Sequence, residues 1–401
     1  MAFLRRRMKG DNSNLMTGAM NAAIAGLKSH MNKLNVIGNN IANVNTFGYK
    51  PGRVVFKDSL YTTMTSGSNG NPTTGGINPS QIGYGVQIGS IDLDMASGDY
   101  SPTGRALDTY IKGDGFFLVG GKDTANIISP DDPESMKSLT LTRVGAFTID
   151  SDGYVVDNYG NCVYGFRCIG YKTKDDGSKE AVFSDQLVPL RLPGYGVKDP
   201  AAQDKEYEVK WPTDGRFDDQ GVFHPDEEAN RLEEAVDGND NTYDRVVLDG
   251  ISIDPGTGAI TGTVKDSDQT ITVGYIGLGI VDNPNGVTHQ SGPYYSAEGG
   301  AGGLNVTTIG GIGESLGITH INGSLAGGQA YPNLKPDDLP DSMRVGSSGT
   351  TSLITGGLEM SKTDLSTEIT EMITTQRGYQ ANTRIVTVTD SMLEELVNMK
   401  R

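Results

Sequence analysis

Apolar residues near the N-terminus recur at the spacing of a helix. From Met20 to Ile41 they follow one another at intervals of four and three residues, the spacing of a coiled-coil seam. Because the residue before a proline is pushed out of the α region, we expect this helix to close at Pro51. The pattern predicts a long amphipathic helix whose packing residues are Leu27, Leu34, Ile37 and Ile41.

A second amphipathic helix is predicted near the C-terminus, where large residues recur every seven positions from Leu358 onward. Ser361 and Asp364 resemble a capping box at its start. Gly378 and numerous threonines are poor helix formers, so the helix should be marginal in isolation. Two interpretations are open: the helices close one intramolecular domain, or they become ordered when several copies pack together. The predicted packing residues are Leu365, Met372, Tyr379, Val386 and Leu393.

Asparagines follow the N-terminal helix on the side opposite its apolar residues, at positions 32, 35, 39 and 43. A solvated face would carry Lys and Glu, whereas carboxamides both donate and accept, so identical copies can pair them without like-charge repulsion. We therefore expect this face to meet another copy of the chain; a merely exposed polar face is the alternative. The predicted register and intersubunit polar contacts are Asn39, Asn40, Asn43, Asn45, Gln376, Arg377 and Asn382.

The middle of the chain alternates apolar and polar residues at 81–95 and again at 258–281, a pattern typical of strands. Short apolar runs predict further strands at 115–119, 146–150 and 153–157. A change of phase near Gly89 predicts a bulge, and the DSDG sequence that ends at Gly153 predicts a hairpin turn. The predicted turn positions are Gly48, Gly113, Gly115 and Gly153.

These patterns predict an α+β, mostly β fold with paired N- and C-terminal coiled-coil helices. The 55 glycines among 401 residues, about twice the usual share, also favour turns and short strands. Residues 176–256 are richer in charge and predict an inserted small β-rich outer domain. The predicted domains are 1–65 with 352–401 for the helices, 66–175 with 257–351 for the β-rich middle, and 176–256 for the insert.

The net charge of −17 resides in the middle of the chain, since residues 1–64 and 352–401 together are positive. An acidic middle without a basic patch argues against nucleic acid as a partner. No run of 18 apolar residues exists, so no transmembrane helix and no membrane role are expected. The basic start MAFLRRRMKG lacks the apolar segment of a secretory signal, so export would need another route.

Patterns for catalysis and metal binding are weak. Residues 313–317 match G-x-S-x-G, but His320 follows closely with no acid between and no βα pattern surrounds the match. The segment that starts at Asp237 begins like a calcium loop, but Thr242 replaces its glycine and Leu248 its bidentate glutamate. We expect no enzyme activity, no metal site and no cofactor.

Cys162 and Cys168 lie in one alternating run, where they share a face. Their spacing, without companion His or Cys, is not that of a zinc site. We interpret them as buried side chains; a disulfide or a reactive role is the alternative.

The sequence NNIANVNTFGYK, residues 39–50, resembles the signature of the bacterial flagellar axial proteins, the rod and hook family. Matching segments follow in the family's order at 105–119, 142–166, 283–295 and 356–390. Distal rod members are typically shorter. The additional residues 176–256 and 299–350 therefore favour the hook branch, with a rod, another axial protein or a hook-cap relative as alternatives.

The resemblance implies an inner coiled-coil domain lining a tube, a middle β shell and an outer insert. It implies self-assembly into a flexible universal joint that transmits motor torque, located in the extracellular flagellum. It also implies export by the flagellar type III apparatus without a cleaved signal, and contact with distal rod, hook-cap and hook–filament junction proteins. The alternative from another class is a secreted β-rich adhesin or hydrolase using residues 313–320.

Overall fold

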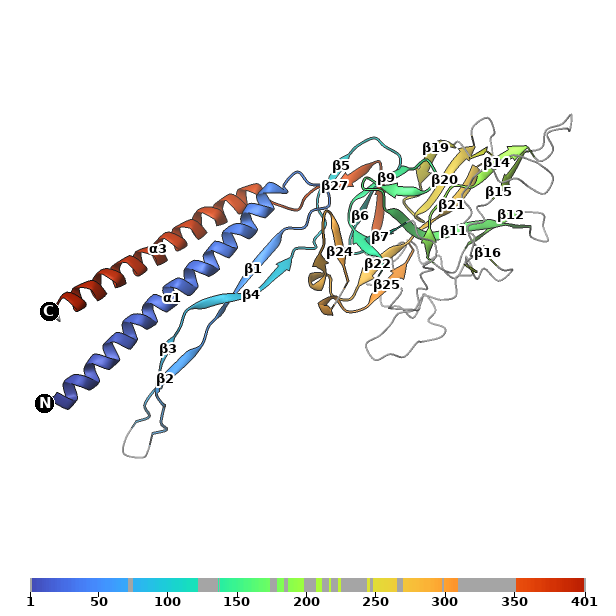
Figure 1. Ribbon diagram of the computed structural model, residues 1–401. Helices are drawn as coiled ribbons and strands as arrows, with labels where there is room; N and C mark the ends of the chain where they lie inside the picture. The colour runs from blue at the N-terminus through green and yellow to red at the C-terminus, as the bar shows by residue number, and fades with distance from the viewer. Residues whose placement is uncertain are drawn as a thin grey trace. The chain divides into compact units, whose positions relative to one another are not determined.

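The computed structural model contains two units (Figure 1). Residues 1–45, 50–94 and 363–401 form the helical unit, and residues 46–49 and 95–362 form the β unit. The residues that the structure describes are 2–70, 75–121, 136, 138–173, 179–183, 187–197, 207–210, 216–217, 223–224, 244–245, 248–264, 270–297, 299–308 and 351–399, with side chains of α1 described from residue 18.

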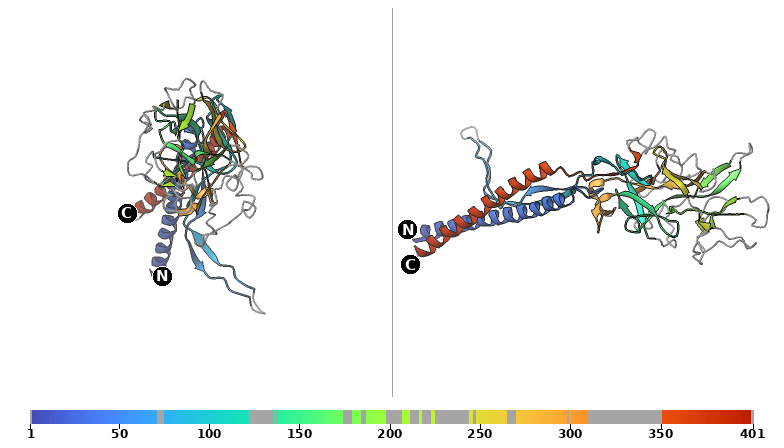
Figure 2. Two further views of the ribbon diagram at one scale, coloured as in Figure 1. Left: turned by 90° about the vertical axis from the view of Figure 1, so that its right-hand side faces the viewer. Right: turned by 90° about the horizontal axis from the view of Figure 1, so that it is seen from above.

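The helical unit is built on α1 (Ala2–Ala42) and α3 (Leu365–Asn398), which lie side by side in Figure 1 and in the right-hand view of Figure 2. Helices at both ends are thus confirmed, but their predicted boundaries are wrong. Helix α1 ends at Ala42 rather than Pro51, and the chain continues in turns. The Asn39 carbonyl oxygen accepts from both the backbone N–H of Asn43, at 3.1 Å, and its side-chain amide, at 2.9 Å.

The start of α3 is set by Asp364 rather than by a capping box from Ser361. The Asp364 carboxylate accepts a hydrogen bond from the Ser366 backbone N–H at 2.9 Å and one from the Thr367 hydroxyl at 2.7 Å. Leu358, which opened the seven-residue pattern, lies outside the helix in strand β27 (Gly357–Glu359).

The helical unit also contains a long two-stranded ribbon. Strand β1 (Gly52–Asp58) pairs antiparallel with β4 (Val86–Leu93), and β2 (Tyr61–Thr65) pairs with β3 (Ser80–Gly83). The register passes from Val55 opposite Ser90 to Phe56 opposite Ile88, so Gly89 is the extra residue. This confirms the predicted bulge.

The β unit is mainly antiparallel sheet. Its described strands are β5 (Tyr100–Pro102), β6 (Asp108–Lys112), β7 (Phe116–Gly120), β8 (Thr140–Thr142), β9 (Gly145–Ile149), β10 (Val155–Asp157), β11 (Cys162–Thr173), β12 (Lys179–Phe183), β13 (Val188–Pro189), β14 (Gly194–Val197), β15 (Tyr207–Lys210), β16 (Arg216–Phe217), β17 (Phe223–His224), β18 (Asp244–Arg245), β19 (Leu248–Ile253), β20 (Ala259–Val264), β21 (Thr270–Ile276), β22 (Leu278–Val281), β23 (Thr288–His289), β24 (Tyr294–Ser296), β25 (Leu304–Thr307), β26 (Ser352–Thr355) and β27. In the largest sheet the order runs β23-β24-β8-β7-β11-β10-β9-β6-β26, and two short 3₁₀ turns lie at Pro284–Gly286 and Gly299–Ala301. The strands predicted at 115–119, 146–150 and 153–157 are confirmed, as is the hairpin between the last two.

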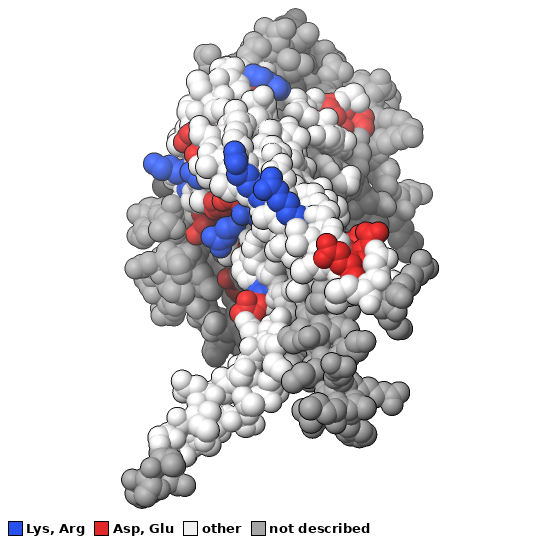
Figure 3. Space-filling view, turned by 90° about the vertical axis from the view of Figure 1, so that its left-hand side faces the viewer, with Lys and Arg blue, Asp and Glu red and all other residues white. Residues whose placement is uncertain are grey.

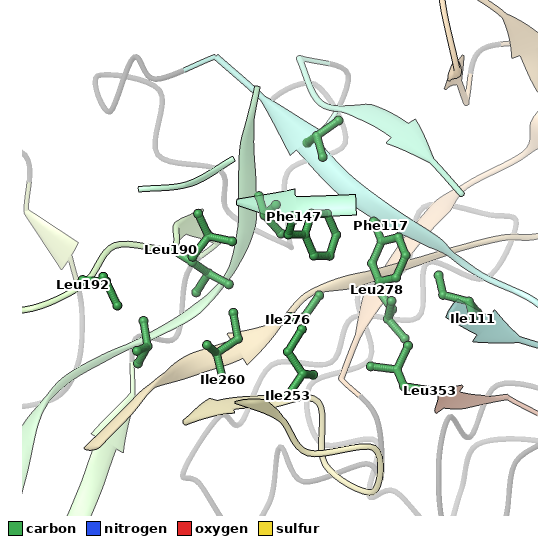
Figure 4. Packing of buried hydrophobic residues seen from close by; sticks show 14 residues of the cluster. Ile111, Phe117, Phe147, Leu190, Leu192, Ile253, Ile260, Ile276, Leu278 and Leu353 are labelled. Atoms are coloured by element: carbon green, nitrogen blue, oxygen red, sulfur yellow. The ribbon is translucent and has the colours of Figure 1, made fainter. Parts of the chain in front are cut away.

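The core of the β unit lies between faces of this sheet (Figure 4). The rings of Phe117 and Phe147 meet edge to face with centroids 5.0 Å apart, a favourable aromatic geometry. Leu353, from the C-terminal part of the chain, packs into the same cluster. Burying such aliphatic and aromatic side chains supplies the main stabilisation of the unit.

The three-domain division stays a prediction. The two units of the structure place the ribbon, residues 52–93, with the helices and residues 352–362 with the sheet. At the edges of the predicted insert, Leu190 and Ile253 belong to the core of the β unit.

Other predicted features lie partly outside the described residues. The G-x-S-x-G segment, His320 and the calcium-like residues 237–242 are outside them.

Cys162 and Cys168 are fully buried in β11. Among the described residues, no group of His, Cys, Asp and Glu is arranged to hold a metal ion. In the described part of the chain, no helix has both the length and the apolar character that crossing a membrane requires.

Candidate functional site

Helices α1 and α3 run antiparallel, and their contacts fix one register. As the residue number increases along α1, the number of the contacting residue in α3 decreases. The contacting pairs are Gly26 with Asn382, His30 with Gly378, Lys33 with Glu371, and Asn40 with Glu368. The two chain ends therefore build one structural element.

Two of these contacts place a glycine of one helix beneath a polar side chain of the other. A Cβ at Gly26 would lie 2.7 Å from Nδ2 of Asn382, and a Cβ at Gly378 would lie 2.9 Å from Cε1 of His30. Helical glycine costs about 1 kcal/mol relative to alanine. Close approach of the helices at both positions explains why the sequence accepts that cost.

Asn40 joins three elements of the helical unit. Its side chain is 2% exposed. Its Nδ2 donates to the Gly52 carbonyl oxygen at 3.0 Å and to Oε1 of Glu368 at 2.9 Å, while its Oδ1 accepts from the Gly52 N–H at 3.0 Å. The amide thus ties α1 to β1 and α3 within one chain. Burial raises the pKa of Glu368, and the hydrogen bond from Asn40 opposes that rise.

A polar and aromatic cluster lies next to the His30 contact. Lys33 Nζ is 2.9 Å from Oε2 of Glu371 and 5.9 Å from the centre of the Phe56 ring. The His30 ring meets the Phe56 ring edge to face at 5.8 Å. Burial, with a smaller effect of the Lys33 charge, lowers the pKa of His30. Neutral histidine is therefore the form that fits this contact.

The predicted packing residues divide between covered and exposed positions. Ile37 is buried, while Leu365 and Tyr379 are exposed in the single chain. The other predicted packing positions, which are half-buried, are Leu27, Leu34, Ile41, Met372, Val386 and Leu393. The fully covered positions of α3 are Thr375 and Thr389, whose small side chains the seven-residue pattern did not select.

Most predicted polar contact residues face outward in the single chain. Asn43 is half-buried, and its Nδ2 donates to Oδ1 of Asn39 at 3.0 Å; Asn382 is half-buried over Gly26. The exposed members are Asn39, Asn45, Gln376 and Arg377. All four predicted turn glycines have φ in the left-handed region, at Gly48 (67°), Gly113 (115°), Gly115 (123°) and Gly153 (79°).

Helix α3 also exposes large apolar side chains that the sequence reasoning missed. Val388 is 57% exposed. The exposed residues in this second line, three or four positions apart, are Ile385, Val388, Met392, Leu396 and Met399. Their spacing was visible in the sequence, but the larger seven-residue repeat took precedence. A contiguous exposed apolar line marks a surface for interaction.

The ribbon has the same character. No charged residue occurs from Ser59 to Ile91, and Leu60, Tyr61 and Ile77 are exposed. In Figure 3 the outer part of the ribbon, which contains β2 and β3, projects without a charged side chain up to the grey tip. The helical unit therefore exposes large apolar side chains on both α3 and the ribbon.

Two family models match the helical ends. Residues 20–50 match the flagella basal body rod protein family, and residues 354–399 match the C-terminal region of the flagellar basal body rod FlgEFG proteins. The two ends of the chain are thus similar to the matching regions of structural proteins of the flagellar axis, the rod and hook proteins.

Relatives of both kinds are similar to the chain along nearly its whole length. It is 27% identical to the flagellar hook protein FlgE of Borreliella burgdorferi, covering 96% of this chain and 100% of the relative. It is 28% identical to the flagellar basal-body rod protein FlgG of Bacillus subtilis, with the same coverage. Its identity to FlgE of Salmonella typhimurium is 25%, covering 94% of this chain and 99% of the relative.

Proposed function

We propose that this chain is the structural subunit of the flagellar hook and that identical copies polymerise through their helical units into a tube. The exposed apolar line of α3 carries the proposal. Those side chains lie outside the contact with α1, and a second copy would remove them from water. A contact between two different surfaces of identical subunits, repeated without closing, produces a helical filament.

The helices act as the inner coiled-coil domain of this polymer. Within a chain, Ile37 and the half-buried residues of α1 and α3 hold the pair together. Between chains, Leu365, Tyr379 and the exposed apolar line of α3 provide apolar contacts. Asn39, Asn45, Gln376 and Arg377 provide polar contacts that set the register, whereas Asn40 sets it within the chain.

The β-rich part forms the middle shell of the tube, and residues 176–256 its outer domain. The hook then acts as a universal joint, because inner contacts hold while outer ones slide. Subunits reach the extracellular flagellum through its type III export apparatus. Their partners are the distal rod, hook-cap and hook–filament junction proteins, and no enzymatic activity or cofactor is involved.

A distal rod subunit is the second candidate, favoured by the similarity to FlgG of Bacillus subtilis along nearly the whole chain. The two can be separated by expressing the chain in bacteria that lack their own hook protein or their own distal rod protein. Restoration of hooks in the first strain alone supports the proposal. Restoration of rods in the second alone would assign the chain to the rod.

The assembly surface is tested with Val388→Glu, because Val388 is exposed and a charge there leaves the α1 contact intact. We expect the variant to keep its unfolding transition and lose polymerisation, measured by sedimentation and electron microscopy. Val388→Ile, which keeps the position apolar, is the control and should polymerise. Normal filaments from the glutamate variant would show that this surface is not an assembly contact.

A further inference from the structure

The β unit contains a fully buried ion pair that the assembly surface does not use. Arg143 and Glu359 have side chains that are 1% and 0% exposed, and Nη1 of Arg143 is 3.8 Å from Oε2 of Glu359. Burying two charges is expensive, and replacing such a pair by apolar residues is often neutral or stabilising. A pair kept in this position therefore calls for an explanation beyond stability.

Arg143 is held by the strands of the sheet. Its Nη1 donates to the carbonyl oxygens of Gly113 at 2.8 Å and Ile111 at 3.4 Å. Its guanidinium lies 5.2 Å from the centre of the Phe116 ring, a cation–π contact. These partners all belong to one part of the β unit, so the guanidinium is held at a fixed position in the sheet.

Glu359 comes from the other end of the chain and gathers backbone groups. Its Oε1 accepts from the Gly98 N–H at 2.8 Å, and Gly98's carbonyl oxygen accepts from the Tyr110 hydroxyl at 2.9 Å. The backbone carbonyl oxygen of Glu359 accepts from the Gly48 N–H at 2.8 Å. One residue thus bonds segments from the N-terminal, middle and C-terminal parts of the sequence.

Gly48 leaves no room for another arrangement. A Cβ at this position would lie 2.9 Å from Cγ2 of Val144 and 3.2 Å from the carbonyl carbon of Arg143, and its φ of 67° favours glycine. The Lys362 N–H donates to the Tyr49 carbonyl oxygen at 3.4 Å. Residues 46–49 and 357–362, here called the two connectors, are therefore bonded to each other beside the arginine.

We propose that Arg143 and Glu359 form a clasp that fastens both connectors to the β unit as one cooperative element. The Glu359 carboxylate lies next to Arg143 only when β27 is paired in the β unit. Only then can the Glu359 carbonyl oxygen accept from the Gly48 N–H. If either connector detaches from the β unit, the hydrogen bonds of the other connector therefore become open to water. The clasp follows from the β unit alone; given the proposed function, it also holds the segments through which α1 and α3 continue into the sheet in sequence.

The test is amide hydrogen exchange of the full unassembled chain, measured by nuclear magnetic resonance. Glu359→Gln keeps the shape and leaves Arg143 without its counter-charge. We expect exchange at the Gly48 and Gly98 amides to accelerate about 100-fold through local opening. Two reference amides in the core, Val155 bonded to Leu190 and Leu190 bonded to Val163, should change little.

Asp99→Asn is the matched control, because Asp99 is exposed next to Gly98 and its change should leave all these amides protected. Gly48→Ala tests the coupling from the other connector and should accelerate exchange at Gly98, which bonds the Glu359 side chain. Equal acceleration across the core in both variants would mean that the pair only stabilises the fold. Unchanged protection at Gly48 in the glutamine variant would overturn the clasp. Neither result depends on polymerisation, so the proposed function is tested separately.

Discussion

His30 of α1 packs directly over Gly378 of α3, so that a Cβ at position 378 would lie 2.9 Å from Cε1 and 3.0 Å from Nε2 of the imidazole. The imidazole also meets the Phe56 ring of the ribbon edge to face, so moving the imidazole away from Gly378 would disturb this second contact. A glycine that weakens α3 in isolation therefore lets the two helices and β1 approach at one point. At position 378, helix propensity favours alanine, whereas packing against His30 favours glycine.

Gly378→Ala tests whether helix propensity or packing against His30 has the larger effect on stability. We expect overpacking against His30 to outweigh the propensity gain and destabilise the helical unit by about 1–2 kcal/mol. Gly38→Ala is the matched control, because a Cβ at this other helical glycine meets no atom within 4 Å. The control should stabilise by up to about 1 kcal/mol. Urea unfolding followed by circular dichroism at 222 nm measures the stability of both variants. Stabilisation by Gly378→Ala would show that His30 moves aside at little cost.

The stability of the helical unit should fall when the pH is lowered below the ordinary pKa of histidine. The pKa of His30 in the folded chain lies below 6.5, first because of burial and second because of Lys33. The unfolded chain therefore binds the proton more readily, and stability that is complete above pH 6.5 is lost as the pH falls toward the folded pKa. Glu368 has a raised pKa, so its contribution runs in the opposite direction but in the more acidic range near and above 4.5.

The measurement compares urea midpoints at pH 7.5 and 5.5 for the natural chain and for His30→Gln. The substitution removes the titrating group and should flatten the dependence in this interval. A glutamine variant that loses stability on acidification as steeply as the natural chain would assign the effect to another group.

Asn40 should be far more important to stability than the other amides of its helix. Asn40→Ala removes the partners of both Gly52 backbone groups and one partner of the half-buried Glu368, so we expect a loss of about 2–3 kcal/mol. Asn35→Ala, at an exposed position of the same helix, should change stability by less than about 0.5 kcal/mol. Unfolding by urea compares the two variants. Equal effects would mean that the bonds of Asn40 are readily replaced by water.

Much of the fold could be predicted because strands and helices leave different periodicities. Short apolar runs around Phe117 and Phe147 marked two core strands, and the change of phase at Gly89 marked the bulge. Boundaries were less predictable. Helix α1 ends at Ala42, well before Pro51, because a proline marks only where a helix can no longer continue and not where it stops.

The candidate site was less accessible to sequence reasoning. A repeat of large residues selected Tyr379, but the helices approach at small residues, so Thr375 is the covered position. Asn40 was predicted as an intersubunit polar contact, although β1 returns along α1 and covers it within the chain. The Arg143–Glu359 pair joins residues more than two hundred positions apart. An isolated charge within an apolar run was its local signal, but nothing in the spacing names the partner.

The amide face of α1 predicts a final difference between folding and assembly. Asn35 is exposed in the single chain, so Asn35→Glu should leave the unfolding midpoint unchanged within about 0.5 kcal/mol. In a polymer whose amide faces meet, every contact would then bring an uncompensated negative charge toward a neighbour. We expect a higher critical concentration for polymerisation, partly restored by added salt, because salt screens exposed charges beyond about 8 Å at physiological ionic strength. Asn35→Gln, which keeps a carboxamide, should assemble normally. If the glutamate variant polymerises like the natural chain, this face is solvated in the polymer, and register must be set by the contacts of α3.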